Sequence, residues 1–452
     1  MTEQTATTTG STRDEVMALL RLAGPLIVNF LAVAGIGFAD AVMAGRMGAE
    51  TLAAVAVGNS VWFLAFSLCL GILMALSPIV ARLHGAGETG AVGRYVRQAL
   101  WLSQMLALSI FVLALLFVRP VLAYIGIDPG FRGMTVDYVH AIMFGLPPMC
   151  VFLVGRFTTE GIGLTRPIMY TSLLSLACNV FGNWVLMYGN LGAPALGAQG
   201  CGLSSAISIW LMTIDLWLYI RRNIRYRPLG IFARFAPPRL PLLRELLSVG
   251  VPISIMITAE TGLFNAVAIL IGTISAQIAA AHQIAINFAA TMFMIPLAIS
   301  SATTVRVGHA LGGGDRSGAR HRGWIGIATC GVFMFFSAMF LLLFRDAVLD
   351  LYTNDVSVKD IATSLLLMAA VFQVADGVQI GAAGALRGYK DTRIPMVINA
   401  FAYWVLAFPL AYLAAVTYRA APAYIWGGFV IGLTVAAVLL TLRYRSIARR
   451  AL

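Results

Sequence analysis

Charged residues are scarce in this chain. They make up 11% of its 452 residues, whereas a soluble domain typically carries about a quarter. So few charges cannot cover a surface that faces water. Hydrophobic residues reach 60%, and apolar runs long enough to cross a hydrocarbon core of about 30 Å recur along the whole sequence. The composition excludes an ordinary soluble protein and predicts an integral membrane protein.

Sequence motifs for catalysis, metal binding and nucleotide binding are also absent. The sequence has no HExxH, GxSxG or P-loop pattern,. Its five cysteines show no CxxC or Cys/His spacing, and its five histidines form no metal-ligand pattern,. The glycine-rich segment 308–320 lacks the lysine of a phosphate-binding loop, so we expect a flexible turn between two spans. These absences argue against an enzyme and against a cofactor, and leave an ion gradient as the energy source for uphill transport.

Two further absences limit the cellular role. The formal net charge is +12, but the basic residues lie between hydrophobic runs and are not gathered with aromatic residues on one aqueous face, which argues against a nucleic-acid partner. The polar N-terminus lacks the basic start and short apolar stretch of a cleaved signal peptide. We therefore expect the first hydrophobic run to remain as a membrane span.

The apolar runs predict an all-α membrane protein of twelve transmembrane helices. They lie near residues 19–43, 52–81, 95–118, 135–157, 167–188, 201–220, 245–272, 278–305, 323–344, 361–384, 394–417 and 423–442,. If both termini are cytoplasmic, 25 of the 31 Lys and Arg residues fall in inner segments, Arg156 and Arg387 among them. This bias is what the positive-inside rule predicts for an even number of spans.

The chain also contains an internal repeat. LRLAGP at 20–25 resembles LSVGVP at 247–252, and Thr165-Arg166 matches Thr392-Arg393 at the same offset in the numbering,. The predicted organisation is a polar tail at 1–18, an N-terminal six-helix lobe at 19–220, a basic cytoplasmic linker at 221–243, a C-terminal six-helix lobe at 244–442 and a basic tail at 443–452. Parallel repeats of this kind are related by a pseudo-two-fold axis along the membrane normal, with the substrate path between them.

Two acidic residues lie deep within predicted spans of the second half. Glu260 follows Arg244 by about 24 Å of helix, and Asp376 precedes Arg387 by about 16 Å. A charge at helix centre costs on the order of 3 kcal/mol, so such an acid normally faces a cavity and has a cation or proton as partner. No Lys or Arg lies within two turns of either acid in the sequence, which favours a mobile partner. The alternative is a permanently protonated acid that bonds a neighbouring helix.

Two other acids in predicted spans are open to a structural interpretation. Asp40 lies about 28 Å from the inner edge, where it is either a functional acid or the cap of a short loop ending at Arg46. Asp215 is close to the basic pair that ends the sixth span, and a local ion pair or snorkelling explains it well.

Polar amides recur at helical spacing in two spans. Gln283 and Asn287 are four residues apart in the eighth span, and Asn179 and Asn183 are four apart in the fifth, so each pair shares one helix face. Such amides either coordinate a dehydrated cation or bond a neighbouring helix, and the second role is the commoner.

Several strings resemble the multidrug and toxic compound extrusion (MATE) family, and within it the NorM-like subgroup. They are FADAVMAGRMG at 38–48, AETGLFNAVAILIG at 259–272, AAHQIAINFAATMFMIPLAISSATTVRVGHALG at 280–312, and FQVADGVQIGAAGALRGYKDTRIPM followed by YWVLAFPLAY. The resemblance implies two six-helix lobes around a central cavity that opens alternately to either side, with substrate expelled in exchange for sodium ions or protons.

The resemblance also implies roles for individual residues. The coupling cation, Na⁺ or H⁺, is expected at Glu260 and Asp376, with Asn287 and Tyr403 as supporting ligands. Gln283 is expected to line the substrate cavity. Independently of the resemblance, we expect the rings of Phe264 and Phe288 to attract an organic cation there. In the N-terminal lobe Asp40 is the matching acid, beside Asn179 and Asn183. The DinF-like subgroup has a second acid where this chain has Asn183, which favours the C-terminal lobe as the coupling site.

The predicted function is therefore export of small, mostly cationic drugs and toxic compounds by a cation-coupled antiporter. We expect a multi-pass protein of the bacterial inner membrane that acts as a monomer, because one chain contains both lobes. Three alternatives stay open: a lipid-linked oligosaccharide flippase, which would need several cationic side chains in its cavity, a passive channel, and an intramembrane enzyme. The sequence does not separate sodium from proton coupling, and it does not name the drugs.

Overall fold

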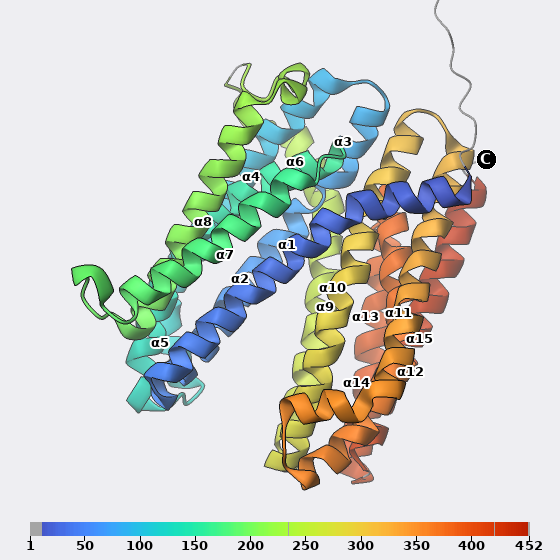
Figure 1. The fold of residues 1–452 in the computed structure, drawn as a ribbon. Coiled ribbons are helices and arrows are strands. Elements are labelled where there is room, and N and C mark those ends of the chain that lie inside the picture. Colours follow the sequence, from blue (N-terminus) through green and yellow to red (C-terminus); the bar gives the residue numbers. More distant parts are fainter. Residues whose placement is uncertain (1–10, 234, 420, 451–452) are drawn as a thin grey trace, which may run out of the picture. The chain divides into compact units, whose positions relative to one another are not determined.

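The computed structural model describes residues 11–233, 235–419 and 421–450. These residues form helices joined by short connections, and no strand occurs among them (Figure 1). They divide into two compact units. The N-terminal unit comprises Pro25–His84 and Glu88–Ser254, and the C-terminal unit comprises the chain up to Gly24, Gly85–Gly87 and Ile255–Leu452. The division falls inside two long helices, beside Pro25 in the first and close to Pro252 in the second.

The N-terminal unit is built from the first eight α-helices. Their bounds are α1 Thr12–Met47, α2 Ala49–Leu73, α3 Leu76–Gly85, α4 Thr89–Tyr124, α5 Pro129–Met143, α6 Leu146–Gly161, α7 Arg166–Leu186 and α8 Gly197–Arg222, with short 3₁₀ segments at Asn190–Gly192 (η1) and Ile224–Leu229 (η2). Helix α8 packs against α7, α5 and α6, and α4 packs against α6. Together these contacts place α8 at the centre of the unit.

The C-terminal unit contains the remaining helices, with α9 belonging to it from Ile255 on. Their bounds are α9 Leu240–Gly272, α10 Ala276–Gly312, α11 Arg316–Tyr352, α12 Val356–Gly388, α13 Arg393–Ala400, α14 Phe408–Tyr412 and α15 Pro422–Arg450. The π-helical segment η3 Phe401–Ala407 joins α13 to α14, a second one, η4 Leu413–Thr417, follows α14, and together they form one continuous span. Helix α12 packs against α10, α11 and α15, and Asp376 in its middle is buried.

The membrane-spanning helices follow the prediction closely. Among the described residues, ten helices are long and apolar enough to cross a bilayer, and the pair α5 and α6, bent by 43°, makes an eleventh span. The predicted span that fails this test is 167–188, which forms α7. Its 21 residues suffice for about 31 Å, but the buried amides Asn179 and Asn183 lower its hydropathy. The helix that departs from the apolar pattern therefore carries part of the predicted polar site.

Most helices extend beyond the predicted apolar runs. Helix α1 begins within the predicted N-terminal tail, whose first ten residues lie outside the described part of the chain, and α15 continues to Arg450. The glycine-rich turn is shorter than the predicted 308–320, because α10 runs to Gly312 and α11 begins at Arg316. There the Asp315 side chain accepts a hydrogen bond from the backbone N–H of Gly318 and caps α11,.

Two of the arginines counted in inner segments, Arg156 and Arg387, are buried inside helices. Arg156 lies in α6 and pairs with Glu160 at 3.9 Å. Arg387 lies in the last turn of α12 and donates to the Ser300 hydroxyl at 2.7 Å. A buried charge is tolerated where polar partners meet it, and sequence position alone does not reveal those partners.

The predicted linker packs on the N-terminal unit. The side chain of Arg97 donates to the carbonyl of Gly230 at 2.5 Å, Gln98 donates to Pro237 at 2.9 Å, and Trp101 donates to Ala236 at 3.0 Å. Tyr226 is buried and donates to the Thr159 hydroxyl, and this burial raises the pKa of its phenol,. Helix α4 therefore anchors the linker.

The same helix packing recurs inside each unit at the offset of the sequence repeat. A Cβ atom on Gly161 would lie 2.7 Å from the side chain of Val80, and one on Gly388 would lie 2.7 Å from that of Val307. Gly161 and Gly388 are separated in the sequence by the same number of residues as Val80 and Val307, and this number is the offset of the sequence repeat. The turn that follows has positive φ at Gly163 (81°) and at Lys390 (58°), again one offset apart. The internal repeat is therefore present in the close contacts between helices as well as in the amino-acid sequence.

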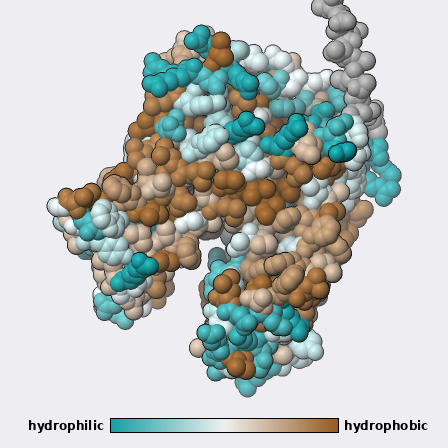
Figure 2. All heavy atoms as spheres, in the orientation of Figure 1, coloured by the Kyte–Doolittle hydropathy of each residue, from teal (hydrophilic) through white to brown (hydrophobic). Residues whose placement is uncertain are grey.

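Apolar residues cover the exposed middle of the helices. In Figure 2 hydrophobic residues dominate the middle of the visible helices, and hydrophilic residues gather towards the helix ends. Large apolar side chains such as Leu108, Leu116, Phe336 and Leu343 are exposed. Contiguous exposed apolar surface of this kind is incompatible with water and fits a bilayer.

Candidate functional site

The C-terminal unit brings the two predicted acids and the predicted phenol together. Glu260 comes from α9, Asp376 from α12, and Tyr403 from the π-helical segment η3. Glu260 and Asp376 interact electrostatically, and both carboxylates act on Tyr403. Asp376 is 5% exposed and Tyr403 is fully buried. Residues that are remote in the sequence thus form one buried acidic site.

This acidic site contains polar atoms that have no partner. Oδ1 of Asp376 and the hydroxyl of Tyr403 are buried without a hydrogen bond. Three neighbouring positions on α12 and α13 also carry fully buried amides without hydrogen-bond partners: Gln373, Gln379 and Asn399. Because an unsatisfied buried polar group costs about 1–3 kcal/mol, so many together indicate a site shaped for a ligand. Carboxylate, phenol and amide oxygens are donors that suit a hard cation or a proton.

Local helix geometry explains how these groups meet. Gln373, Asp376 and Gln379 follow one another at intervals of three along α12 and so share one face. Tyr403 lies in a π-helical segment, and Asn399 is one turn before it. Pro409 follows in the same span, and a proline removes a backbone hydrogen bond, which loosens regular α-helical pairing in the preceding turns. π-Segments within helices are frequent at functional sites.

A fixed cation also acts on this site, which the sequence did not predict. Arg387 interacts electrostatically with Glu260, and its guanidinium is held by Ser300. The Gln379 amide lies beside the Glu260 carboxylate without closing a hydrogen bond of normal geometry. Arg387 is three turns from Asp376 along α12 and lies on a different helix from Glu260, so the sequence alone does not bring its charge near that carboxylate.

The remaining residues predicted for this unit are spread over two helices. Asn287 and Gln283 are exposed, one turn apart on α10. Phe264 stacks on Phe429 with ring centroids 4.8 Å apart, and Phe288 is buried in the apolar core. The two predicted cavity rings therefore take part in packing, whereas the two amides reach the surface of the unit.

The N-terminal unit contains a second buried acid with a different environment. Asp40 of α1 is 6% exposed and accepts hydrogen bonds from Asn183 at 2.6 Å and from the Ser205 hydroxyl at 3.1 Å. Asn179 donates to the same Ser205 oxygen at 3.0 Å, and its own side-chain oxygen accepts from Asn183 at 3.3 Å. The interpretation of Asp40 as a loop cap is wrong, because the residue lies inside α1 and bonds two other helices.

Two neighbours of Asp40 were missed in the sequence. Ser205 lies on α8, and Tyr138 on α5 is fully buried, interacts electrostatically with Asp40 and has an unpartnered hydroxyl. A serine in a small-residue run gives no signal by itself, and Tyr138 lies at the polar start of its span. Their role is visible only once α5, α7 and α8 are packed together.

Metal chelation by a classical ligand cluster is not seen in the part of the chain that the structure describes. No group of three or more His, Cys, Asp and Glu side chains comes together there. The two acidic sites instead combine one or two carboxylates with amides and hydroxyls. Oxygen ligands of this kind suit a monovalent cation or a proton better than a tightly chelated transition metal.

Comparison with known proteins identifies the family. The MatE family model matches residues 25–185 and 252–413. The chain belongs to the MatE family. The starts of the two matched ranges, 25 and 252, are related by the same offset as the sequence repeat and the repeated contacts. The family match and the long apolar helices of the described residues together identify a multi-pass membrane protein.

Curated relatives match the MatE chain over almost its entire length. The multidrug resistance protein PmpM of Pseudomonas aeruginosa is 40% identical over 97% of this chain and 93% of its own. The probable multidrug resistance protein NorM of Xanthomonas campestris is 42% identical over 96% of this chain and 95% of its own. The NorM-like resemblance of the motifs is confirmed.

Solved structures of MATE transporters share the fold. The eukaryotic MATE transporter AtDTX14 superimposes with a TM-score of 0.87 at 21% identity, over 97% of this chain and 98% of its own. An outward-facing multidrug resistance MATE transporter of the MOP superfamily gives 0.87 at 22% identity, over 97% and 96%. At such identities the likeness concerns the fold, and it confirms the predicted all-α membrane architecture.

Proposed function

We propose that this MatE protein is a cation-coupled antiporter that exports small, mostly cationic organic molecules, drugs included, by alternating access. The names of its curated relatives, multidrug resistance proteins, support the substrate class. The observation that carries the proposal is the buried acidic site of the C-terminal unit, where Asp376 and Tyr403 have polar atoms without partners. Such a site gains free energy from a mobile cation and is costly without one.

Exchange follows from competition for the same negative charge. In the low-dielectric interior a carboxylate attracts a nearby cation far more strongly than it would in water. An organic cation and a coupling ion that both require Glu260 or Asp376 cannot be held together at full strength. When sodium or a proton neutralises the carboxylate, most of the attraction for the organic cation is lost and the substrate leaves.

The ligand set fits either coupling ion. For Na⁺ the two carboxylates, the Tyr403 phenol and the Gln379 amide are oxygen donors, with Asn287 as the further ligand that the family resemblance implies. For H⁺ the acid pair shares one proton, because two neighbouring carboxylates repel each other when both are ionised. Arg387 contributes a constant positive charge in both cases, which keeps the site from binding any cation too tightly.

We further propose an inner-membrane location in a bacterial cell with both termini in the cytoplasm. The basis is the distribution of Lys and Arg between the spans. A single chain contains both units, so a monomer is sufficient for the transport cycle.

The proposal is tested with purified protein in liposomes loaded with a fluorescent organic cation. An inward sodium gradient and an inward proton gradient are imposed separately, and efflux is followed by fluorescence. Efflux that one gradient accelerates and an ionophore abolishes is the expected result and identifies the coupling ion. Efflux at the same rate with either gradient, or with none, contradicts antiport and favours a passive channel.

A flippase for a lipid-linked oligosaccharide is the remaining rival. It would use cationic side chains to hold a pyrophosphate, and the two buried arginines of the spans are already engaged, Arg156 with Glu160 and Arg387 with Ser300. Translocation of a fluorescent pyrophosphate-linked lipid in the same liposomes, without efflux of the organic cation, would favour this rival.

A further inference from the structure

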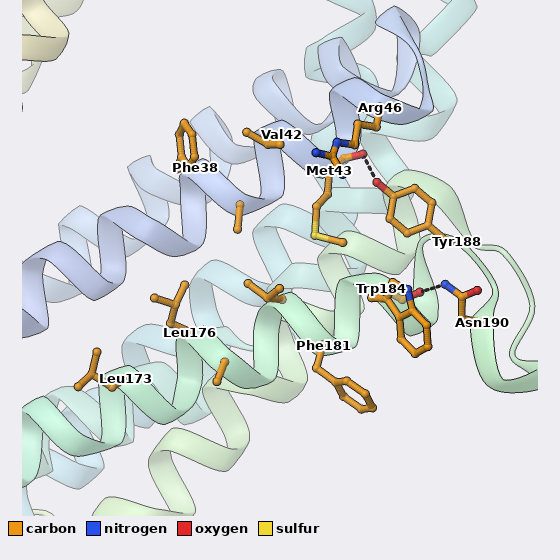
Figure 3. Close-up of a pocket in the computed structure, with 13 residues that line it drawn as sticks. Phe38, Val42, Met43, Arg46, Leu173, Leu176, Phe181, Trp184, Tyr188 and Asn190 are labelled. Carbon is orange, nitrogen blue, oxygen red and sulfur yellow. Dashed lines mark hydrogen bonds between the residues drawn. The ribbon is translucent and has the colours of Figure 1, made fainter. Parts of the chain in front are cut away.

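A long groove lies on the surface of the N-terminal unit, between α1 and α7. Its volume is about 1080 Å³. Figure 3 shows side chains from both helices along its walls, with Phe38 and Val42 on α1 and Leu173, Leu176 and Phe181 on α7. The groove is separate from the acidic site of this unit, because Asp40 points into the helix packing and bonds Asn183 and Ser205.

Polar side chains are confined to one end of the groove. Arg46, Tyr188 and Asn190 are its polar lining residues. The Tyr188 hydroxyl donates to the carbonyl of Met43 at 2.8 Å, and the Asn190 amide donates to the carbonyl of Trp184 at 2.8 Å (Figure 3). These bonds fix the phenol and the amide, and no salt bridge to Arg46 occurs among the described residues. The groove therefore has a cationic end and an apolar body.

The dimensions of this groove match one leaflet of a bilayer. From Leu173 to Trp184 the α7 wall extends about 16 Å, close to half of a hydrocarbon core of about 30 Å. Trp184 and Tyr188 are of the residue types that collect at the membrane–water interface. The cationic end thus lies at the level of lipid headgroups, and the apolar body extends towards the bilayer centre.

We infer that the groove is a binding site for one anionic phospholipid, with its phosphate on Arg46 and an acyl chain along α7. The positive charge of Arg46 complements a phosphate and repels an organic cation, so the occupant differs from the exported substrate. The apolar walls offer an acyl chain the contacts that it would have in the bilayer, while the arginine adds an attraction that a neutral site lacks.

A second groove provides an internal comparison. It has a volume of about 660 Å³ and lies beside α15 in the C-terminal unit, with Tyr418 and Tyr424 among its lining residues. No charged residue occurs among the described residues that line it. We expect lipids to exchange freely there, without preference for an anionic headgroup.

Native mass spectrometry of the full chain tests the inference. The protein is reconstituted in nanodiscs of phosphatidylglycerol and phosphatidylethanolamine, extracted in mild detergent and analysed for retained lipid. Wild type is expected to retain one phosphatidylglycerol, and Arg46→Gln to lower that retention about fivefold, the effect of one cation near a lipid surface. Arg119→Gln is the matched control, because Arg119 is an exposed arginine on α4 outside the groove.

A second variant tests the apolar body. Ala177→Phe places a ring in the groove, keeps Arg46 and changes an exposed position, so we expect it to fold as wild type does. Loss of the retained phosphatidylglycerol in this variant supports the site. Retention equal to wild type in both Arg46→Gln and Ala177→Phe overturns it. A change of organic-cation efflux in Arg46→Gln with unchanged lipid retention also overturns it, because the groove would then belong to the substrate path.

Discussion

The two units each bury an acid inside the membrane, but they satisfy it differently. In the N-terminal unit both oxygens of Asp40 accept hydrogen bonds from amide and hydroxyl groups of the protein. In the C-terminal unit Asp376 has an oxygen without a partner, and the Tyr403 hydroxyl is also unpartnered. A carboxylate whose hydrogen bonds are all made by the protein stabilises helix packing. A carboxylate with an unpartnered oxygen is available to bind a ligand. The comparison favours coupling at the C-terminal unit and a role in helix packing, first of all, for Asp40.

Neutralising the acids of the C-terminal unit is the strongest test of this difference. Glu260→Gln or Asp376→Asn removes the charge for which the organic cation and the coupling ion compete. We expect gradient-driven efflux in liposomes to fall to the level of empty membranes. Asp215→Asn is the control, because it neutralises a half-buried acid of a spanning helix outside both sites, and it should transport normally. Wild-type efflux in Glu260→Gln and Asp376→Asn would refute the assignment.

Truncating one amide in each unit compares satisfied with unsatisfied polar groups. Asn183→Ala removes the 2.6 Å hydrogen bond to Asp40 and leaves a buried carboxylate short of a donor, at a cost of about 2–3 kcal/mol. Asn399→Ala removes an amide that makes no hydrogen bond and should cost clearly less. Thermal unfolding of the two variants in detergent measures the difference. Equal losses of stability would mean that the two acid sites are built alike.

A second acid placed beside Asp40 should turn the satisfied site into an ion-dependent one. Asn183→Asp replaces a hydrogen-bond donor with a carboxylate that repels Asp40. We expect the variant to unfold at lower temperature at about pH 8 in choline chloride, and to recover at about pH 6 or in sodium chloride, because a proton or a sodium ion then bridges the two acids. Wild type serves as the reference and should respond less. An equal response of both proteins would contradict the expected role of the Asn183 amide.

The smallest expected effect concerns the turn that recurs in both units. Gly163 and Lys390 occupy the same left-handed conformation, which only glycine adopts without a penalty of about 1–2 kcal/mol. Gly163→Ala should lower the free energy of unfolding by about that amount. Lys390→Gly should raise it by less, because Lys390 makes interactions of its own in the folded protein. Denaturation of both variants against wild type decides whether the turns are equivalent.

Much of this protein was predictable because the bilayer imposes simple rules on a sequence. Spans must be apolar and about 20 residues long, so the helices could be located, except that α7 fails the apolar criterion. The internal repeat was visible in short strings that match at one offset. Glu260 and Asp376 were conspicuous because a charge in an apolar run is costly.

Other features depend on contacts between residues that are remote in the sequence. Arg387 was counted only as a positive charge of an inner segment, yet it is buried beside Ser300 and acts on Glu260. Asp40 was open to interpretation as a cap, and only the packing of α7 and α8 against α1 supplies its donors. Gln379 and Asn399 gave no signal, since an amide in a span more commonly bonds a neighbouring helix than binds a ligand.

The sequence by itself determined that the chain is helical, crosses a membrane many times and carries acids within the bilayer, because each of these follows from local hydropathy and the cost of burying charge. Only the tertiary structure decided which acid has its hydrogen bonds satisfied and which does not. That distinction depends on the few ångströms between side chains of different helices, and no pattern along a single helix encodes it.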